Sequence, residues 1–379
     1  MSFHKILQQR INENLNFIQI LIGPRQVGKT TAIKRILENW KGSKIFETAD
    51  TPLVADGSWI ELHWQRARQL PGPVLLVFDE IQKVPNWSEK IKVLFDQDRS
   101  SRKLRIVLLG SASLTIQKGL TESLVGRYEI IPAYHWDYNE SKSNFGWDIN
   151  TFLKFGGYPA GAELIQDPHR WQNFMRSSVL EPVLSSDIMG LVEINKPALF
   201  RQTCALCLKY PAQELSLNKI LGSLQDKGNV TTIRHYLDLL EGAFLIKTLT
   251  KYSGAAHIAK ASIPKIIPLA PALVHAFSDP KKISDDLDWR GRVFEAVVGA
   301  ALNRLGGELY YWREANKEVD FVFVLQEQIH AIEVKSGRAN ARQNGLMAFH
   351  KKYPTAKLHI IDALNFVEVL ESLCDRTLT

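Results

Sequence analysis

The sequence lacks a long apolar run, and this absence excludes several classes of protein. Its longest runs, FIQILI and PVLLVF, have the length of a strand. Both fall far below the roughly 18 to 20 apolar residues that a membrane-spanning helix needs. The opening residues, MSFHKILQQRINEN, also lack the apolar stretch of a secretory signal. We therefore expect a cytoplasmic protein with no membrane partner.

Cysteine is scarce as well. Three cysteines in 379 residues cannot support a disulfide framework, and an odd count argues further against one. Cys204 and Cys207 form a CxxC pair in the apolar run FRQTCALCLKYP, but no second pair is present to complete a zinc site. We expect two buried cysteines on a helix.

Low-complexity segments are absent too, and the composition is that of a folded protein with 45% hydrophobic and 23% charged residues. A chain of 379 residues exceeds the size of one hydrophobic core, which predicts two or three domains. The net charge of +7 and the pI of about 9.1 are compatible with a polyanionic partner. Many basic proteins bind no nucleic acid, so charge alone does not identify that partner.

The first 140 residues alternate strand-like apolar runs with helical patterns, which is typical of a parallel sheet covered by helices. This rhythm predicts one α/β domain. Its expected strands are residues 17–22, 44–48, 74–79, 105–110 and 128–133.

After residue 140 the strand-like apolar runs give way to helical patterns, which continue to about residue 210. Residues 213–250 then show two short helical segments, broken by DKGN and followed by the strand-like AFLIKTL, an order that suits a helix-turn-helix with a wing. A last unit has an expected helix at 289–305 and strands at 309–313, 318–325 and 329–335.

The stretch GPRQVGKTT has the G-x-x-x-x-G-K-[ST] pattern of a phosphate-binding loop, placed between a predicted strand and a predicted helix. Gly23 and Gly28 let backbone N–H groups point at phosphate oxygens, Lys29 reaches the β and γ phosphates, and Thr30 ligates magnesium. The sequence thus predicts an ATP and Mg²⁺ site. Its expected nucleotide-binding residues are Gly23, Pro24, Arg25, Gln26, Val27, Gly28, Lys29, Thr30 and Thr31.

Acidic residues follow another predicted strand in PVLLVFDE. We expect Asp79 to hold the magnesium through water and Glu80 to polarise the attacking water. Ser111, or else Ser113, is the candidate sensor of the γ phosphate. Arg127 is expected to stabilise the transition state, from the same chain or from a neighbouring subunit, unless it is an ordinary surface arginine.

A second group of charges lies in the predicted hairpin EVDFVFVLQEQIHAIEVKSG. A tight hairpin brings Asp320 near Glu333 and Lys335, and two carboxylates there predict a magnesium site in which Lys335 stabilises developing charge. Glu295, on the preceding helix, either reaches the same metal or pairs with Arg292 or a lysine.

This order of a helix with Glu, a strand with Asp and a strand with Glu-x-Lys resembles the PD-(D/E)XK nuclease superfamily. Over nearly the whole chain, motifs such as GPRQVGKTT, LLVFDEIQKVPNW, GRYEIIP, SSDI and EVDFV with EVKS resemble prokaryotic AAA-type ATPases whose C-terminal domain of unknown function has a nuclease-like core. The resemblance implies an α/β chain of four parts. These are an AAA-type P-loop ATPase domain at 1–140, a helical lid-like domain at 141–210, a winged helix-turn-helix at 211–262 and a restriction-endonuclease-like domain at 263–379.

Two functions are compatible with these features. In the first, ATP binding and hydrolysis control DNA binding or Mg²⁺-dependent phosphodiester cleavage, with Lys227, Arg234 and Lys247 touching phosphates. In the second, the chain is an ATP-dependent switch whose nuclease-like domain only binds DNA or a partner protein. The helix pair could also be purely structural. A homo-oligomer is compatible with either function.

Overall fold

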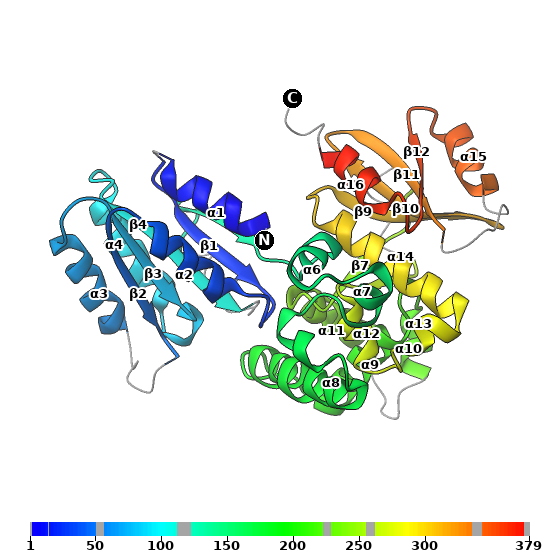
Figure 1. Cartoon of the computed structure of the whole chain (residues 1–379), viewed down its shortest axis with the longest axis horizontal. Helices are drawn as coiled ribbons and strands as arrows, with labels where there is room; N and C mark the ends of the chain where they lie inside the picture. Colours follow the sequence, from blue (N-terminus) through cyan, green and yellow to red (C-terminus); the bar gives the residue numbers. More distant parts are fainter. Residues whose placement is uncertain are drawn as a thin grey trace. The chain divides into compact units, whose positions relative to one another are not determined.

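The computed structural model of the chain (Figure 1) describes residues 2–13, 15–50, 57–111, 123–222, 229–254, 262–335 and 343–374. The chain divides into two compact units. The first consists of Met1–His135 together with Pro182–Glu193, and the second of Trp136–Glu181 together with Ile194–Thr379.

The first unit is a parallel sheet between two layers of helices. In chain order its elements are α1 (Ser2–Asn12), β1 (Ile18–Gly23), α2 (Lys29–Asn39), β2 (Ser43–Thr48), α3 (Gly57–Gln69), β3 (Val74–Asp79), η1 (Ile81–Lys83), α4 (Trp87–Asp98), β4 (Leu104–Ser111), β5 (Tyr128–Pro132) and the π-helical η4 (Val183–Ile188). The strand order is β2-β3-β4-β1-β5, and every pairing is parallel. The five predicted strands and their parallel arrangement are confirmed.

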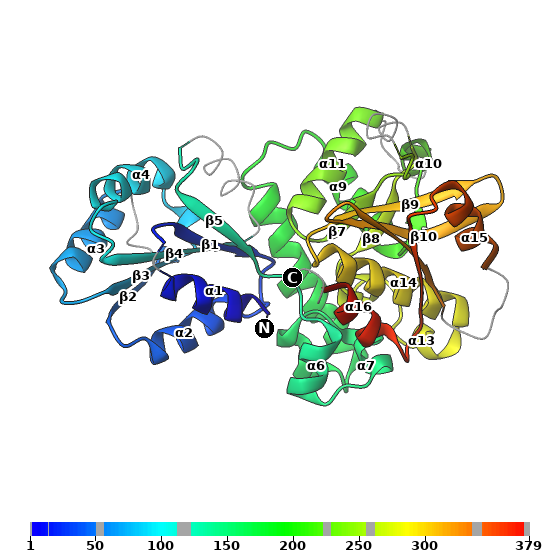
Figure 2. The ribbon, with the colours of Figure 1, turned by 90° about the horizontal axis from the view of Figure 1, so that it is seen from above.

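The apolar runs form central strands because both faces of this sheet are covered. The side chains of β1 and β3 are buried along the whole length of each strand. Helices α1 and α2 pack on one face, where Leu7 and Ile33 contact Leu21 and Val77, while α3 and α4 lie over the other face (Figure 2). The carboxyl ends of the strands therefore meet at one edge of the sheet, which a parallel α/β sheet uses for ligands.

The second unit contains the remaining elements. They are α6 (Tyr138–Phe145), α7 (Ile149–Phe155), η2 (Pro159–Leu164), α8 (Pro168–Phe174), η3 (Met175–Leu180), α9 (Pro197–Lys209), β6 (Gln213–Glu214), α10 (Leu217–Gly222), α11 (Val230–Gly242), β7 (Ile246–Leu249), β8 (Lys265–Pro268), α12 (Pro271–His275), α13 (Lys282–Asp285), α14 (Leu287–Asn303), β9 (Glu308–Glu314), β10 (Lys317–Leu325), β11 (Gln328–Val334), α15 (Gln343–Lys352), β12 (Lys357–Ile361) and α16 (Phe366–Cys374). The segments expected at 141–210, 211–262 and 263–379 all belong to this unit, apart from Pro182–Glu193.

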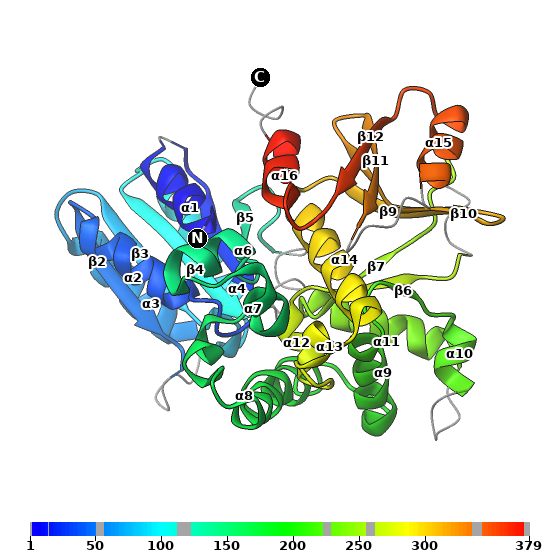
Figure 3. The same ribbon diagram turned by 45° about the vertical axis from the view of Figure 1, so that its right-hand side comes forward.

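Two sheets organise this unit. The smaller has the order β6-β8-β7 and is antiparallel. The larger has the order β12-β11-β10-β9, with a parallel pairing only between β11 and β12. Helices α14 and α16 pack on one face of the larger sheet and α15 on the other (Figure 3). The predicted hairpin is present as β10 and β11.

The two cysteines of the CxxC pair lie one turn apart on α9 and are fully buried. Burial raises the pKa of the Cys204 thiol to about 12, which makes it an inert core group. The expectation of two buried helical cysteines is confirmed. Among the residues that the structure describes, no helix is both long and apolar enough to cross a membrane.

Candidate functional site

The phosphate loop joins the end of β1 to the start of α2, as the motif requires. A Cβ on Gly23 would lie 2.0 Å from the carbonyl oxygen of Ala133, so only glycine lets the loop pass. Gly28 has φ of 90°, in the left-handed region that glycine tolerates. The loop backbone therefore has the shape in which N–H groups at a helix N-terminus face an anion.

Lys29 lies over this loop. Its ammonium donates hydrogen bonds to the carbonyl oxygens of Gly23, at 2.9 Å, and of Pro24, at 2.6 Å. The side chain is only 8% exposed, and this burial lowers the pKa of Lys29 from 10.5 to about 8. The hydrogen bonds therefore hold the Lys29 ammonium beside the phosphate loop.

Thr30 and Asp79 meet at the carboxyl edge of the sheet. The Thr30 hydroxyl, at the start of α2, donates to Oδ2 of Asp79 at 2.9 Å, although β4 separates β3 from β1, the strand that precedes α2. A hydroxyl and a carboxylate are the hard oxygen donors that Mg²⁺ takes together with water and phosphate. The two predicted magnesium residues therefore fit that ion.

Glu80 directly follows Asp79 and has a left-handed backbone with φ of 53°. Its carboxylate accepts a 2.6 Å hydrogen bond from Nε2 of Gln82, and the same nitrogen lies 3.2 Å from the hydroxyl of Ser111. Gln82 thus connects the predicted base to the predicted γ-phosphate sensor. The motif DEIQ contained Gln82, but sequence reasoning gave this glutamine no role. The alternative sensor, Ser113, lies outside the described residues.

A second residue that sequence reasoning missed is Asp187, on η4. It forms a two-pronged ion pair with Arg25 of the phosphate loop, with distances of 2.7 and 2.6 Å. Asp187 is 7% exposed, and its hydrogen bond raises the pKa of Arg25. The fragment SSDI lies far along the chain from the loop, so only the fold reveals this contact.

Arg127 is not part of this site within the chain, and the expectation that it acts in cis is wrong. Its carbonyl oxygen accepts from the backbone N–H of Ile18, at the amino end of β1. The six residues from Ile18 to Gly23 span about 16 Å of strand, which is five rises of about 3.3 Å, so Arg127 lies at the opposite edge of the sheet. Its guanidinium instead pairs with Asp96. A role for Arg127 in a neighbouring subunit stays a prediction.

The residues expected to touch DNA are distributed along the predicted helix-turn-helix. Arg234 is exposed on α11. Lys247, on β7, forms an ion pair with Glu241, so its charge is partly compensated. Lys227 lies outside the described residues. Helices α10 and α11 followed by β7 and β8 have the order of a winged helix, which stays a prediction.

The C-terminal hairpin carries Asp320 on β10 and Glu333 on β11. The regular pairing of these strands ends with Phe321 opposite Ile332, and β10 is irregular between Val319 and Val322, where Asp320 lies. Oδ2 of Asp320 accepts from the backbone N–H of Val334 at 2.8 Å, and Glu333 is completely buried. Lys335 directly follows β11 and is half-buried. The hairpin thus places Asp320 and Glu333 on adjacent strands, as the pattern predicts.

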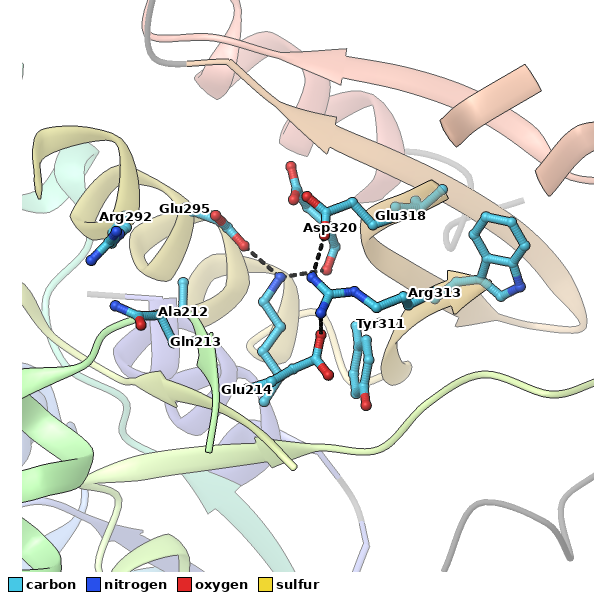
Figure 4. Close-up of a pocket in the computed structure, with 12 residues that line it drawn as sticks. Ala212, Gln213, Glu214, Arg292, Glu295, Tyr311, Arg313, Glu318 and Asp320 are labelled. Atoms are coloured by element: carbon cyan, nitrogen blue, oxygen red, sulfur yellow. Dashed lines mark hydrogen bonds and ion pairs between the residues drawn. The ribbon is translucent and has the colours of Figure 1, made fainter. Parts of the chain in front are cut away.

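Glu295 does not join these carboxylates as a third metal ligand, and that expectation is wrong. It forms an ion pair with Lys265, the open alternative of a lysine partner (Figure 4). Glu333 also points away from Glu295. Its neighbours Ile332 and Val334 pack on the α14 side of the sheet, and side chains alternate along a strand, so Glu333 projects toward the other face. Within the described ranges, no three His, Cys, Asp or Glu side chains converge as a metal site.

Lys265 was missed because the run IPKIIP was given no role in the sequence analysis. The available signal was a charged residue between apolar neighbours on a strand.

Comparison with known proteins addresses the two units differently. A family model described as "AAA domain" matches residues 15–142. This match includes the phosphate loop and all five strands of the first unit's sheet. Two further models match residues 146–284 and 290–371, and both are described only as domains of unknown function, DUF8612 and DUF4143.

Two relatives that align with most of this chain are both described as uncharacterized proteins. One from Methanocaldococcus jannaschii is 25% identical over 384 residues, covering 93% of this chain and 83% of that protein. One from Mycobacterium tuberculosis is 28% identical over 331 residues, covering 84% of this chain and 70% of that protein. Among solved structures, the Thermotoga maritima RuvB Holliday junction branch migration motor aligns with a TM-score of 0.32 and 16% identity, covering 65% of this chain and 86% of that one.

The buried Lys29 predicts an unusual pH dependence of ATP binding. Its pKa of about 8 means that the ammonium loses its proton as pH rises through 8, whereas below 8 it stays charged. ATP affinity should therefore level off about one pH unit below 8 and fall toward about tenfold per pH unit from about one unit above it. Titration of a fluorescent ATP analogue between about pH 7.5 and 10 measures this. Lys29→Arg, which stays protonated, should show no such fall. A flat wild-type profile would contradict the assignment.

Gln82 should act on turnover and not on nucleotide affinity, because it contacts Glu80 and Ser111 and orients both. We expect Gln82→Leu to lower kcat by about tenfold or more while the Kd for ATP stays nearly unchanged. Steady-state phosphate release and equilibrium binding separate the two effects. Gln65→Leu, on the exposed face of α3, is the matched control and should leave both values unchanged. Equal losses in kcat and affinity for Gln82→Leu would point to a general disturbance of the fold.

Proposed function

We propose that the protein is a Mg²⁺-dependent ATPase whose nucleotide state controls nucleic-acid binding by its second unit, without cleavage of the nucleic acid. The observation that carries the ATPase part is the meeting of the phosphate loop with Thr30, Asp79 and Glu80 at one edge of the sheet. The loop and Thr30 follow β1, whereas Asp79 and Glu80 lie at the end of β3, and a parallel sheet brings these groups together only at its carboxyl edge.

The roles of the residues follow from their positions. The loop N–H groups and Lys29 bind the phosphates, and Thr30 and Asp79 would hold the Mg²⁺. When bound, that ion neutralises charge on the β and γ phosphates. Glu80 accepts a proton from a water whose oxygen attacks the γ phosphorus, and the bond to the bridging oxygen breaks. Gln82 fixes the Glu80 carboxylate beside Ser111 for this step.

The coupling between nucleotide and second unit is supported by the Arg25 contact with Asp187. The phosphates of ATP are anions at the same loop and compete with Asp187 for the Arg25 guanidinium. The segment Pro182–Glu193 packs with the first unit, yet the chain on both sides of it belongs to the second. A displacement of this segment is therefore carried covalently into the second unit. A ligand shifts an equilibrium only through such state-dependent contacts.

Nucleic acid is the proposed partner because of the basic charge and the predicted helix-turn-helix. The net charge is +7, and Arg234 is exposed on the second of the two helices. Binding without cleavage is favoured because the Glu295 carboxylate, one of three proposed metal ligands, is already paired with Lys265. Phosphate contacts of this kind give affinity that falls steeply with salt.

The ATPase assignment is tested with Lys29→Ala and Glu80→Gln. Lys29→Ala should lose ATP binding because it removes the cation at the loop. Glu80→Gln should bind ATP like the wild type but hydrolyse it at least about a hundredfold more slowly, because an amide cannot accept the proton. Fluorescent-nucleotide binding and phosphate release measure the two effects. Glu89→Gln, an exposed acid on α4, is the control and should behave as wild type. Undiminished turnover by Glu80→Gln would remove the assignment of the base.

The coupling is tested by the anisotropy of fluorescent DNA with Glu80→Gln in ATP and wild type in ADP. We expect affinities that differ by about fivefold or more between the two nucleotide states. Asp187→Asn should reduce this difference, because its neutral amide forms no ion pair with Arg25, whereas Glu193→Gln in the same segment should preserve it.

Three results would contradict parts of this proposal. A DNA affinity that does not depend on the nucleotide would remove the switch, and a full difference in Asp187→Asn would remove the proposed link. Cutting of the same DNA in Mg²⁺, abolished by Asp320→Ala, would show that the second unit is a nuclease.

A further inference from the structure

A pocket of about 390 Å³ lies in the second unit where β6, β8, β9, β10 and α14 meet. Charged side chains line it from several elements. Figure 4 shows Glu295 on α14, Asp320 and Glu318 on β10, Arg313 on β9 and Glu214 on β6 around this space. Because Glu295 and Asp320 both line the pocket, the groups that balance their charge decide what the pocket can bind.

Lys265, the first residue of β8, places its ammonium in the middle of this charge cluster. The side chain is only 6% exposed, and its Nζ pairs with the carboxylate of Glu295. The same nitrogen donates to the backbone carbonyl of Asp320 at 3.0 Å and lies 4.8 Å from the ring centre of Phe321. A carboxylate, a carbonyl and an aromatic face are all partners that stabilise a buried cation.

The ammonium keeps its charge despite its burial. Burial opposes the charged form, but the ion pair with Glu295 and the hydrogen bond to the Asp320 carbonyl stabilise it. A buried lysine without such partners would lose its proton instead.

The other acids of the pocket are also compensated from within the chain. Arg313 forms ion pairs with Glu214 and with Glu318. The carboxylate of Asp320 accepts a hydrogen bond from the N–H of Val334. A divalent cation would have to displace an ammonium that is attached to the same strand framework and so cannot diffuse away.

We propose that Lys265 is the resident cation of this pocket and occupies the place that a divalent metal would take between Glu295 and Asp320. The wild-type pocket then binds no Mg²⁺ or Mn²⁺, and Lys265 is a positioning residue that holds the end of β8 to α14 and β10. The inference concerns the second unit and does not depend on the ATPase assignment.

If Lys265 takes the place of a metal ion, removal of its ammonium should create a metal-binding site. Lys265→Met keeps most of the side-chain volume but removes the ammonium that pairs with the Glu295 carboxylate. We expect this full-length variant to gain one Mn²⁺ site per chain by electron paramagnetic resonance in the absence of nucleotide. Saturating Mn²⁺ should also raise its Tm by roughly 5 °C or more, through binding to the folded state. Nucleotide-free wild type should show neither effect.

Two controls isolate the site. Lys265→Met combined with Glu295→Gln should lose the gained Mn²⁺ site, because a carboxylate is removed along with the ammonium. Lys265→Arg keeps a cation and should bind no Mn²⁺. Any Mn²⁺ held at the phosphate loop is common to all variants and cancels in the comparison.

Two outcomes would overturn the proposal. One is a folded Lys265→Met, verified by circular dichroism, that gains no Mn²⁺ site. The other is a wild-type Mn²⁺ site that disappears in Asp320→Asn or Glu295→Gln. If Lys265→Met does not accumulate as folded protein, the wild-type comparison alone decides. Mn²⁺ binding unchanged by Asp320→Asn supports the resident ammonium, and loss of one site excludes it.

Discussion

The carboxyl edge of one parallel sheet is the constraint on which the proposed activity of this protein depends. Strands β1, β3 and β4 all end there, so the loop after β1, the acids after β3 and Ser111 at the end of β4 are brought within reach of one another. The close approach of Gly23 to the Ala133 carbonyl fixes the loop against the chain that follows β5. None of the groups would form a site alone, because a phosphate needs several donors and a metal needs several oxygens at once.

Charge compensation governs the second unit in a comparable way. Its larger sheet carries Asp320 and Glu333 on adjacent strands, where unbalanced carboxylates would be costly. The pocket beside them has internal cations, with Lys265 paired to Glu295 and Arg313 paired to Glu214 and Glu318. A fold that brings acids together can therefore be stable without an external ion. The same pairs then decide which ligands the pocket admits.

Local sequence patterns predict much of the fold and part of the candidate site. The five strands of the first unit and the β10 and β11 hairpin were predicted because buried strands and tight turns are encoded by neighbouring residues. The phosphate loop, Thr30 and Asp79 could be assigned because the motif fixes its own secondary structure. Arg127 directly precedes the strand predicted at 128–133, so its position at the amino end could have been inferred, whereas its pairing with Asp96 on α4 could not. Glu295 was misplaced because its partner, Lys265, is 30 residues away on another element.

The sequence by itself determined the strand and helix order, the phosphate-binding loop and the hairpin that carries Asp320 and Glu333, since each rests on residues close in the chain. Tertiary structure alone decided that Gln82 joins Glu80 to Ser111, that Asp187 pairs with Arg25, and that Glu295 pairs with Lys265. These contacts join different strands and helices. Side-chain direction and burial, which set them, follow from how the elements pack and are not encoded by spacing along the chain.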